Sequence, residues 1–123
     1  MIVKPADELR ELVSNVLLAA GADERNARGV AEHLVMANLS GVDTHGVWHL
    51  EGYVKAIKAD EIVPTTWPEI VRETPTSALI SGNWTFGHVV ARYAMEVAIE
   101  KAKAHDMAVV GLVQSHHIGR LGY

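Results

Sequence analysis

The spacing of the apolar residues changes at two prolines, Pro64 and Pro68. Before them, three runs place apolar side chains three and four residues apart, which is the spacing of an amphipathic helix. A proline biases the residue before it to extended geometry, so helical structure is expected to end here. After them, short alternating or continuous apolar runs are typical of strands. The change predicts an α/β fold, with a helical region at 1–68 and an α/β region at 69–123.

Single residues that start or stop elements set the expected bounds. The first helix is expected to begin near Pro5 and to stop at Gly21. Asp23 is expected to cap a second helix that ends near Gly41, and a third helix is expected from about Gly46. The rest of the chain predicts strands at 69–73 and 77–81, a helix at 88–105 and a strand at 107–113.

The last predicted strand, residues 107–113, is an uninterrupted apolar run, which favours burial on both faces of a sheet. A polar turn follows it, at the carboxyl end of the strand, where ligands bind in open α/β sheets. One buried strand and one strand pair do not make a covered sheet. We therefore expect the chain to be truncated, with the larger part of the α/β domain beyond residue 123.

Charge and composition exclude several classes of protein. The net charge is −4 and the basic residues form no cluster, so a nucleic-acid partner is not expected. Cysteine is absent, which excludes disulfides and thiolate chemistry. No apolar segment reaches the roughly 20 residues that a membrane span needs, and the start of the chain turns acidic at once. We expect a cytoplasmic protein that has no membrane partner.

A carboxylate, a hydroxyl and an imidazole stand side by side at Asp43, Thr44 and His45, followed by Gly46. Histidine titrates near neutrality and suits general acid–base catalysis, and its two neighbours can orient the ring. Gly46 leaves room for a ligand or for a close backbone. His45, Thr44 and Asp43 are therefore candidate catalytic residues. The simpler alternative is that Asp43 or Thr44 only caps a helix and His45 lies in its first turn.

His45 and His49 are four residues apart, as are the two histidines of the HExxH zinc motif. The glutamate of that motif is missing, because Gly46 and Val47 follow His45, and no third ligand is indicated. We therefore assign no metal site. The other isolated histidines are expected to be solvated or capping, and the tryptophans to lie in the core or an interface: His33, His88 and His105; Trp48, Trp67 and Trp84.

The second polar group is Ser115-His116-His117-Ile118-Gly119, directly after the last strand. Its position favours a turn that contacts a cofactor or substrate. An ordinary polar loop is the alternative.

Several of these motifs together resemble one family. The run from Gly41 to Val47 resembles the signature G-[IV]-D-S-H-G-[VI] of the type-2 malate/L-lactate dehydrogenase family, which includes sulfolactate and ureidoglycolate dehydrogenases. The run from Gln114 to Gly119 is similar to the family's N-S-x-H-x-G turn. The segment from Gly82 to Gly87 falls between them in family order, and the resemblance covers the whole chain.

The resemblance implies an oxidoreductase that transfers a hydride between NAD or NADP and a small 2-hydroxy acid or its 2-oxo counterpart. It implies a mixed α/β cofactor domain unlike the Rossmann fold, and the chain has no G-x-G-x-x-G. Residues 1–68 would serve substrate binding and dimerisation, and residues 69–123 would begin the cofactor domain. The family's members are homodimers.

The resemblance also implies roles for single residues. His45 would exchange the proton with the substrate oxygen, and Thr44 stands where the family usually has serine. His116, His117, Ile118 and Gly119 would contact the cofactor, and His117 also the substrate. His49 would line the substrate site, although the family commonly has there an arginine that grips a carboxylate. The alternative function is a non-catalytic helical fragment for dimerisation or binding.

Overall fold

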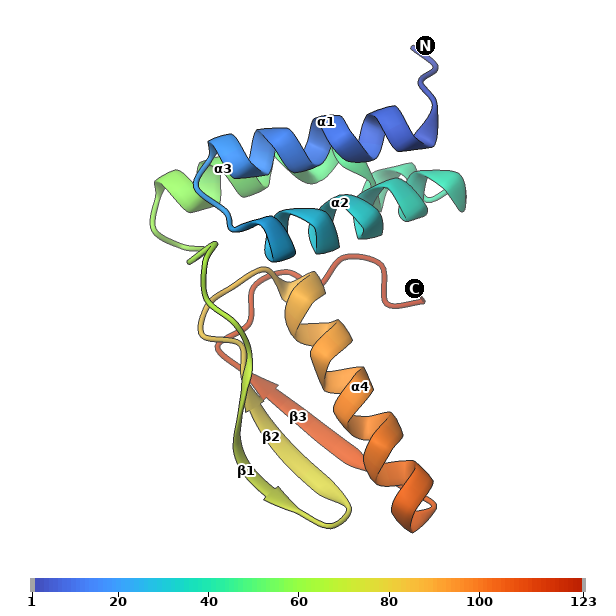
Figure 1. Cartoon of the computed structure of the whole chain (residues 1–123), viewed down its shortest axis with the longest axis vertical. Coiled ribbons are helices and arrows are strands. Elements are labelled where there is room, and N and C mark those ends of the chain that lie inside the picture. Colours follow the sequence, from blue (N-terminus) through green and yellow to red (C-terminus); the bar gives the residue numbers. More distant parts are fainter. Residues whose placement is uncertain (1, 123) are drawn as a thin grey trace. The chain divides into compact units, whose positions relative to one another are not determined.

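The computed structural model describes residues 2–122 and divides the chain into two compact units (Figure 1). The first unit comprises Met1–Thr65 together with Gly119–Tyr123, and the second comprises Thr66–Ile118. The helices of the first unit precede the sheet of the second along the chain, so the predicted α/β class with an N-terminal helical segment is confirmed. No helix within residues 2–122 is long and apolar enough to cross a membrane.

The first unit is built from three helices: α1 (Ala6–Ala19), α2 (Glu24–Leu39) and α3 (Leu50–Lys58). The connection between α1 and α2 follows the sequence prediction. Gly21 has a φ of +105°, a conformation that glycine adopts without steric cost. The Asp23 side chain accepts a hydrogen bond of 2.8 Å from the backbone N–H of Asn26, which caps α2.

The core of the first unit lies mainly along α2, which packs against α1. Its fully or nearly fully buried apolar side chains are Val13, Leu17, Ala27, Val30, Ala31, Leu34, Val35, Ala37, Tyr53, Ala56 and Ile62. Two polar side chains of α2 are buried with them. Asn26 donates from Nδ2 to the Pro64 carbonyl at 2.9 Å, and His33 accepts the Arg120 N–H at Nε2 at 3.1 Å. The prediction that His33 is solvated or capping is therefore wrong.

The third helix begins at Leu50, not near Gly46 as the sequence predicts. Two short 3₁₀ turns precede it, η1 (Asp43–His45) and η2 (Val47–His49), and Gly46 between them is extended, with φ −91° and ψ −152°. A helix cannot run through this extended residue. The main chain therefore changes direction directly after the candidate histidine.

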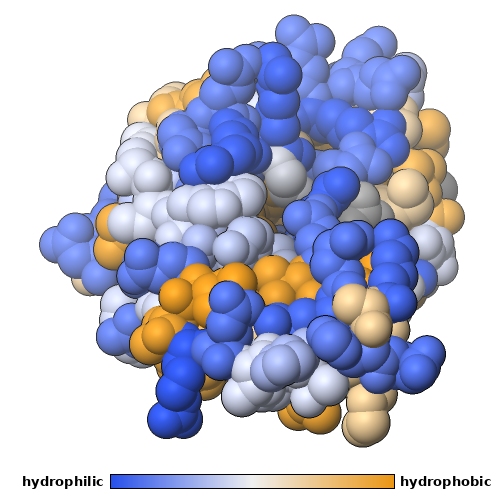
Figure 2. Space-filling view, turned by 60° about the horizontal axis from the view of Figure 1, so that its bottom comes forward, coloured by the Kyte–Doolittle hydropathy of each residue, from blue (hydrophilic) through white to orange (hydrophobic). Residues whose placement is uncertain are grey.

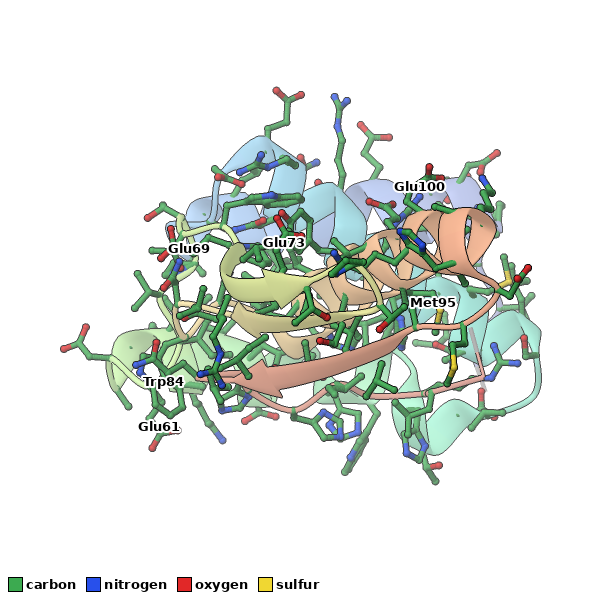
Figure 3. The ribbon with its side chains drawn as sticks, turned by 90° about the horizontal axis from the view of Figure 1, so that it is seen from below. Glu61, Glu69, Glu73, Trp84, Met95 and Glu100 are labelled. Carbon is green, nitrogen blue, oxygen red and sulfur yellow. The ribbon has the colours of Figure 1, made fainter. Side chains whose placement is uncertain are left out.

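The second unit is a three-stranded sheet with one helix: β1 (Glu69–Thr74), β2 (Ser77–Ser81), α4 (Gly87–His105) and β3 (Val109–Val113). The strand order is β1-β2-β3, with β1 antiparallel and β3 parallel to β2. The register of β1 on β2 shifts between Ile70 and Arg72. Glu73 of β1 lies on the α4 side of the sheet (Figure 3) and pairs with Lys101 of α4 at 2.7 Å.

Alternate residues of the strands face α4. Ile80, Val90 and Ala94 form the buried cluster, and Tyr93, Val97, Val110 and Leu112 pack against it. The other face of β3 is open: Val109 is 64% exposed and Val113 42%. The prediction that this strand is buried on both faces is wrong for the described residues. Figure 2 shows apolar residues, in orange, exposed to solvent on the face in view.

Candidate functional site

The turn between α2 and α3 carries the first group of candidate residues. Backbone hydrogen bonds close it in short steps: His45 N–H to the Val42 carbonyl at 3.0 Å, and Gly46 N–H to the Asp43 carbonyl at 3.0 Å. His49 N–H then donates to the Gly46 carbonyl at 3.1 Å. These bonds define η1 and η2 and place the side chains of positions 43–45 on a tight turn. Asp43 and Thr44 are exposed, and His45 is half-buried.

The amide of Asn38, on the last turn of α2, connects the two 3₁₀ turns. Its Nδ2 donates to Asp43 Oδ1 at 2.6 Å, and its Oδ1 accepts the Val47 N–H at 2.9 Å. The space beside Gly46 is filled by the same amide, because a Cβ built at Gly46 would lie 2.1 Å from Asn38 Oδ1. The sequence indicated that Gly46 leaves room for a ligand or a backbone; the structure fills that room with an asparagine side chain.

The imidazole of His45 contacts its neighbour in sequence. Thr44 Oγ1 lies 3.0 Å from His45 Nδ1, a hydrogen bond in which either group can donate. The expectation that Asp43 or Thr44 caps a helix is wrong, because Val42 and Gly46 are the residues that precede the two turns. The hydroxyl therefore orients the ring instead of capping a helix.

His49 lies between two other rings. Its centroid is 6.1 Å from that of His45 and 5.9 Å from that of Tyr53, with which it is stacked at 28°. Tyr53 is 4% exposed, and burial raises the pKa of its hydroxyl above the ordinary value because the phenolate is disfavoured there. Trp48, between these residues in sequence, is 80% exposed, so it is not in the core of this chain.

The second group of candidates lies in the turn after β3. Ser115 Oγ donates to the His116 carbonyl at 3.2 Å, and Gly119 has a φ of +83°. This turn lies directly against the start of α4, because a Cβ built at Gly87 would lie 2.3 Å from the carbonyl oxygen of His116 and 2.2 Å from that of His117. The backbone of the turn therefore requires glycine at the first residue of α4.

Of the two histidines of this turn, His116 is half-buried and His117 is exposed. The ring of His117 contacts that of His88 edge-on, with centroids 6.4 Å apart. His88 is 4% exposed, so its predicted solvated or capping position is wrong. His116 Nδ1 is buried and has no hydrogen-bond partner among the residues that the structure describes. A buried ring nitrogen of this kind favours a ligand group that could pair with it.

A strained loop stands beside the same strand ends. Asn83 and Trp84 have φ of 48° and 58°, and Gln114 has 51°, values that are uncommon for residues other than glycine. Trp84 N–H donates to the Gln114 carbonyl at 2.9 Å, and Asn83 Nδ2 donates to the Trp67 carbonyl at 2.9 Å. Trp84 is 50% exposed beyond the end of β3 (Figure 3), so it too lies outside the core. Such strain is often retained at functional sites.

The candidates thus fall into two groups. Asp43, Thr44, His45 and His49 share the turn of the first unit, and His116 to Ile118 share the turn of the second. Within residues 2–122, no three potential ligand side chains are placed to hold a metal ion. Sequence reasoning missed Asn38, Gly87 and His88. The only available signal for Asn38 was Gly46, whose missing side chain indicated a close neighbour without naming it.

A helical segment with a histidine turn, followed by a small mixed sheet with a second polar turn, defines an α/β protein with two candidate polar sites. Comparison with known proteins identifies the family. Residues 4–123 match the family described as malate/L-lactate dehydrogenase, and the chain belongs to that family. The predicted resemblance is confirmed.

Similar proteins agree with this assignment. Malate dehydrogenase of Pyrococcus abyssi is 41% identical over 119 residues, which are 97% of this chain and 33% of that protein. Malate/(S)-sulfolactate dehydrogenase of Methanothermus fervidus is 41% identical over 123 residues, 100% of this chain and 36% of that protein. The structure of sulfolactate dehydrogenase from Methanocaldococcus jannaschii matches with a TM-score of 0.94 at 36% identity, covering 100% of this chain and 36% of that one. The chain spans about a third of the length of these relatives.

Proposed function

We propose that this chain contributes the substrate-side part of an oxidoreductase that transfers a hydride between NAD or NADP and a small 2-hydroxy acid or its 2-oxo counterpart. Family membership and relatives named for malate, sulfolactate and hydroxycarboxylate support this reaction class. In this proposal, residues 1–68 take part in substrate binding and dimerisation, and residues 69–123 form the beginning of the cofactor-binding domain. A nicotinamide cofactor, when bound, would supply the hydride transfer.

His45 is the proposed acid–base group, and its contact with Thr44 is the observation that carries the proposal. When the alcohol is oxidised, its hydroxyl proton goes to His45 Nε2 and the ring becomes an imidazolium. In both charge states Nδ1–H can donate to Thr44 Oγ1, so one hydrogen bond holds the ring before and after proton transfer. The 2-oxo acid takes the proton back in the reverse reaction.

Other residues take supporting roles in the proposal. Asp43 stabilises the turn, since its carboxylate accepts a hydrogen bond from Asn38 Nδ2. His49 and His117 line the substrate site, and as imidazoles they can each donate one hydrogen bond in a given direction to a carboxylate. An arginine would offer two parallel bonds, so the preferred acid is expected to differ from that of relatives with arginine at position 49.

The turn 116–119 is the proposed cofactor contact, with His116, His117, Ile118 and Gly119 as its residues. The buried His116 Nδ1 fits this role, because a polar group of the cofactor would give that nitrogen a partner. The tight approach of the two histidine carbonyls to Gly87 holds the turn in one shape. These residues bind and orient; they exchange no proton in the proposed scheme.

A homodimer is part of the same proposal, and so is a cytoplasmic location. Trp48 is 80% exposed and Leu39 59%, and both lie beside the His45 turn, where a second copy could cover them. The same exposure favours the second candidate function, a helical module for dimerisation or binding without catalysis. A turnover assay on the native protein separates the two functions.

The test is His45→Ala in the native protein that carries this sequence, assayed by nicotinamide absorbance with 2-hydroxy acids. Turnover should fall roughly 10²- to 10⁴-fold, the usual effect of losing an acid–base group, and binding of the reduced cofactor should hardly change. His105→Ala, at the exposed end of α4, is the matched control and should keep full turnover. Near-normal turnover of His45→Ala would show that another group moves the proton.

A further inference from the structure

Asn38 occupies a particular place at the end of α2. Its amide lies beside a groove of about 490 Å³ whose lining is mostly apolar: Ile2, Val3, Ala6, Leu9, Val35, Leu39 and Val47, with Lys4. Asn38 is half-buried beside this groove, and the hydrogen bond that it donates to Asp43 lies at the exposed side of the turn. Both of its polar atoms have partners, and both partners belong to the turn that carries His45.

The two hydrogen bonds do different work. The Val47 N–H stands at the start of η2, where a helical turn leaves its first N–H groups without main-chain partners, and Asn38 Oδ1 satisfies it. The Asp43 carboxylate stands at the start of η1, and Asn38 Nδ2 binds it. One amide therefore connects the residues two before and two after His45. This arrangement fixes the change of chain direction at Gly46.

We infer that Asn38 is a positioning residue for His45, an inference that rests on the acid–base role proposed above. Asn38 touches neither substrate nor cofactor in this scheme; it acts through the turn. An amide suits the task because it donates and accepts at once and does not titrate, so its two bonds persist while the charge of His45 changes.

Three variants test the inference by the order of their kcat values. Asn38→Leu keeps the volume and removes both bonds. Asn38→Asp keeps an acceptor for the Val47 N–H and loses the donor to Asp43, whose exposed carboxylate turns into water away from the new charge. Asn15→Leu makes the same change as the first variant on the exposed face of α1 and serves as the matched control.

In the native protein, Asn38→Leu should lower kcat roughly 10- to 100-fold with the substrate KM within about twofold, because misplacing a catalytic group weakens the transition state and not the ground state. Asn38→Asp should recover most of kcat, and Asn15→Leu should match the wild type. Amide hydrogen exchange at Val47 should quicken in Asn38→Leu and stay slow in Asn38→Asp. A merely structural role would lower thermal stability without this ordered change in kcat.

Measuring His45→Ala alongside keeps the two proposals apart. If His45→Ala is inactive while Asn38→Leu keeps wild-type kcat, the positioning role is overturned and the acid–base role stands. If His45→Ala stays active, the acid–base role fails together with the positioning of a catalytic group. Equal losses of kcat in Asn38→Leu and Asn38→Asp would overturn the inference, because the retained acceptor would then do nothing. If Asn38→Leu does not fold, Asn38→Asp still decides, since the inference requires it to keep most of kcat and slow exchange at Val47.

Discussion

Gly46→Ala tests the packing of the His45 turn directly. The added Cβ would lie 2.1, 2.4 and 2.6 Å from Oδ1, Cγ and Nδ2 of Asn38, so close that one of the two side chains must shift. The backbone of Gly46 has a φ of −91°, outside the left-handed region, so the cost comes from space and not from φ. The Asn38 amide must therefore swing away and give up both of its hydrogen bonds.

The magnitude follows from those two bonds. Each is worth about 1 kcal/mol net, which gives a loss of about 2 kcal/mol. Alanine restricts the unfolded chain more than glycine does, which returns about 0.7 kcal/mol. The net destabilisation of the turn is then about 1.3 kcal/mol, or roughly tenfold in the equilibrium for local opening.

The assay is amide hydrogen exchange at Val47 together with urea unfolding. Gly52→Ala is the matched control, because a Cβ at Gly52 meets no heavy atom within 4 Å and alanine favours the helix α3 there. Gly46→Ala should be destabilising in the wild type and neutral or stabilising in an Asn38→Ala background, where the space is open. Equal effects in the two backgrounds, within about 0.5 kcal/mol, would refute the reasoning.

Two further predictions concern Tyr53 and Gly87. Burial raises the pKa of Tyr53 in the folded state, so its contribution to stability is complete below the unfolded pKa of about 10 and is lost as pH rises above that value. Tyr53→Phe should therefore lose less unfolding free energy than the wild type between about pH 9 and pH 11, and parallel losses would contradict this. Gly87→Ala should destabilise by about 1–3 kcal/mol and weaken cofactor binding, because its Cβ would meet two backbone carbonyls that cannot rotate away. Unfolding and cofactor titration measure this against Gly111→Ala, whose Cβ would meet Leu79 at an ordinary 3.5 Å; equal behaviour of the two variants would contradict it.

Local signals predicted most of the elements. The helix end at Gly21 and the cap at Asp23 depend on residues within a few positions, so sequence spacing alone was enough for both. The same holds for the strand pair after Pro68 and for the helix that ends at His105. Side-chain patterns of this range act within one turn or one hairpin, where sequence neighbours are also neighbours in space.

The features that sequence missed depend on contacts over a longer range. The start of the third helix shifted to Leu50 because Asn38, on the preceding helix, holds Val47 in a separate turn. The burial of His33 depends on a partner at Arg120, at the far end of the chain. The periodic spacing of apolar residues does not reveal contacts between residues so far apart in the sequence. The candidate histidines could be chosen by chemistry, whereas the groups that hold their turns became visible only in three dimensions.

The glycines fall into two groups, those needed for backbone conformation and those needed because a side chain has no space. Gly21 and Gly41 have φ of +105° and +73° and no heavy atom within 4 Å of a built Cβ, so they serve backbone conformation at helix ends. Gly46 and Gly87 do not have a positive φ, yet a Cβ built at either position would lie within 2.6 Å of polar atoms. The first kind is recognisable from helix-stop patterns. The second kind stands beside the two polar turns and marks where another part of the fold presses against a candidate site. An alanine scan of these four glycines should therefore change Val47 exchange and cofactor binding only at the second pair, while the first pair changes helix stability alone.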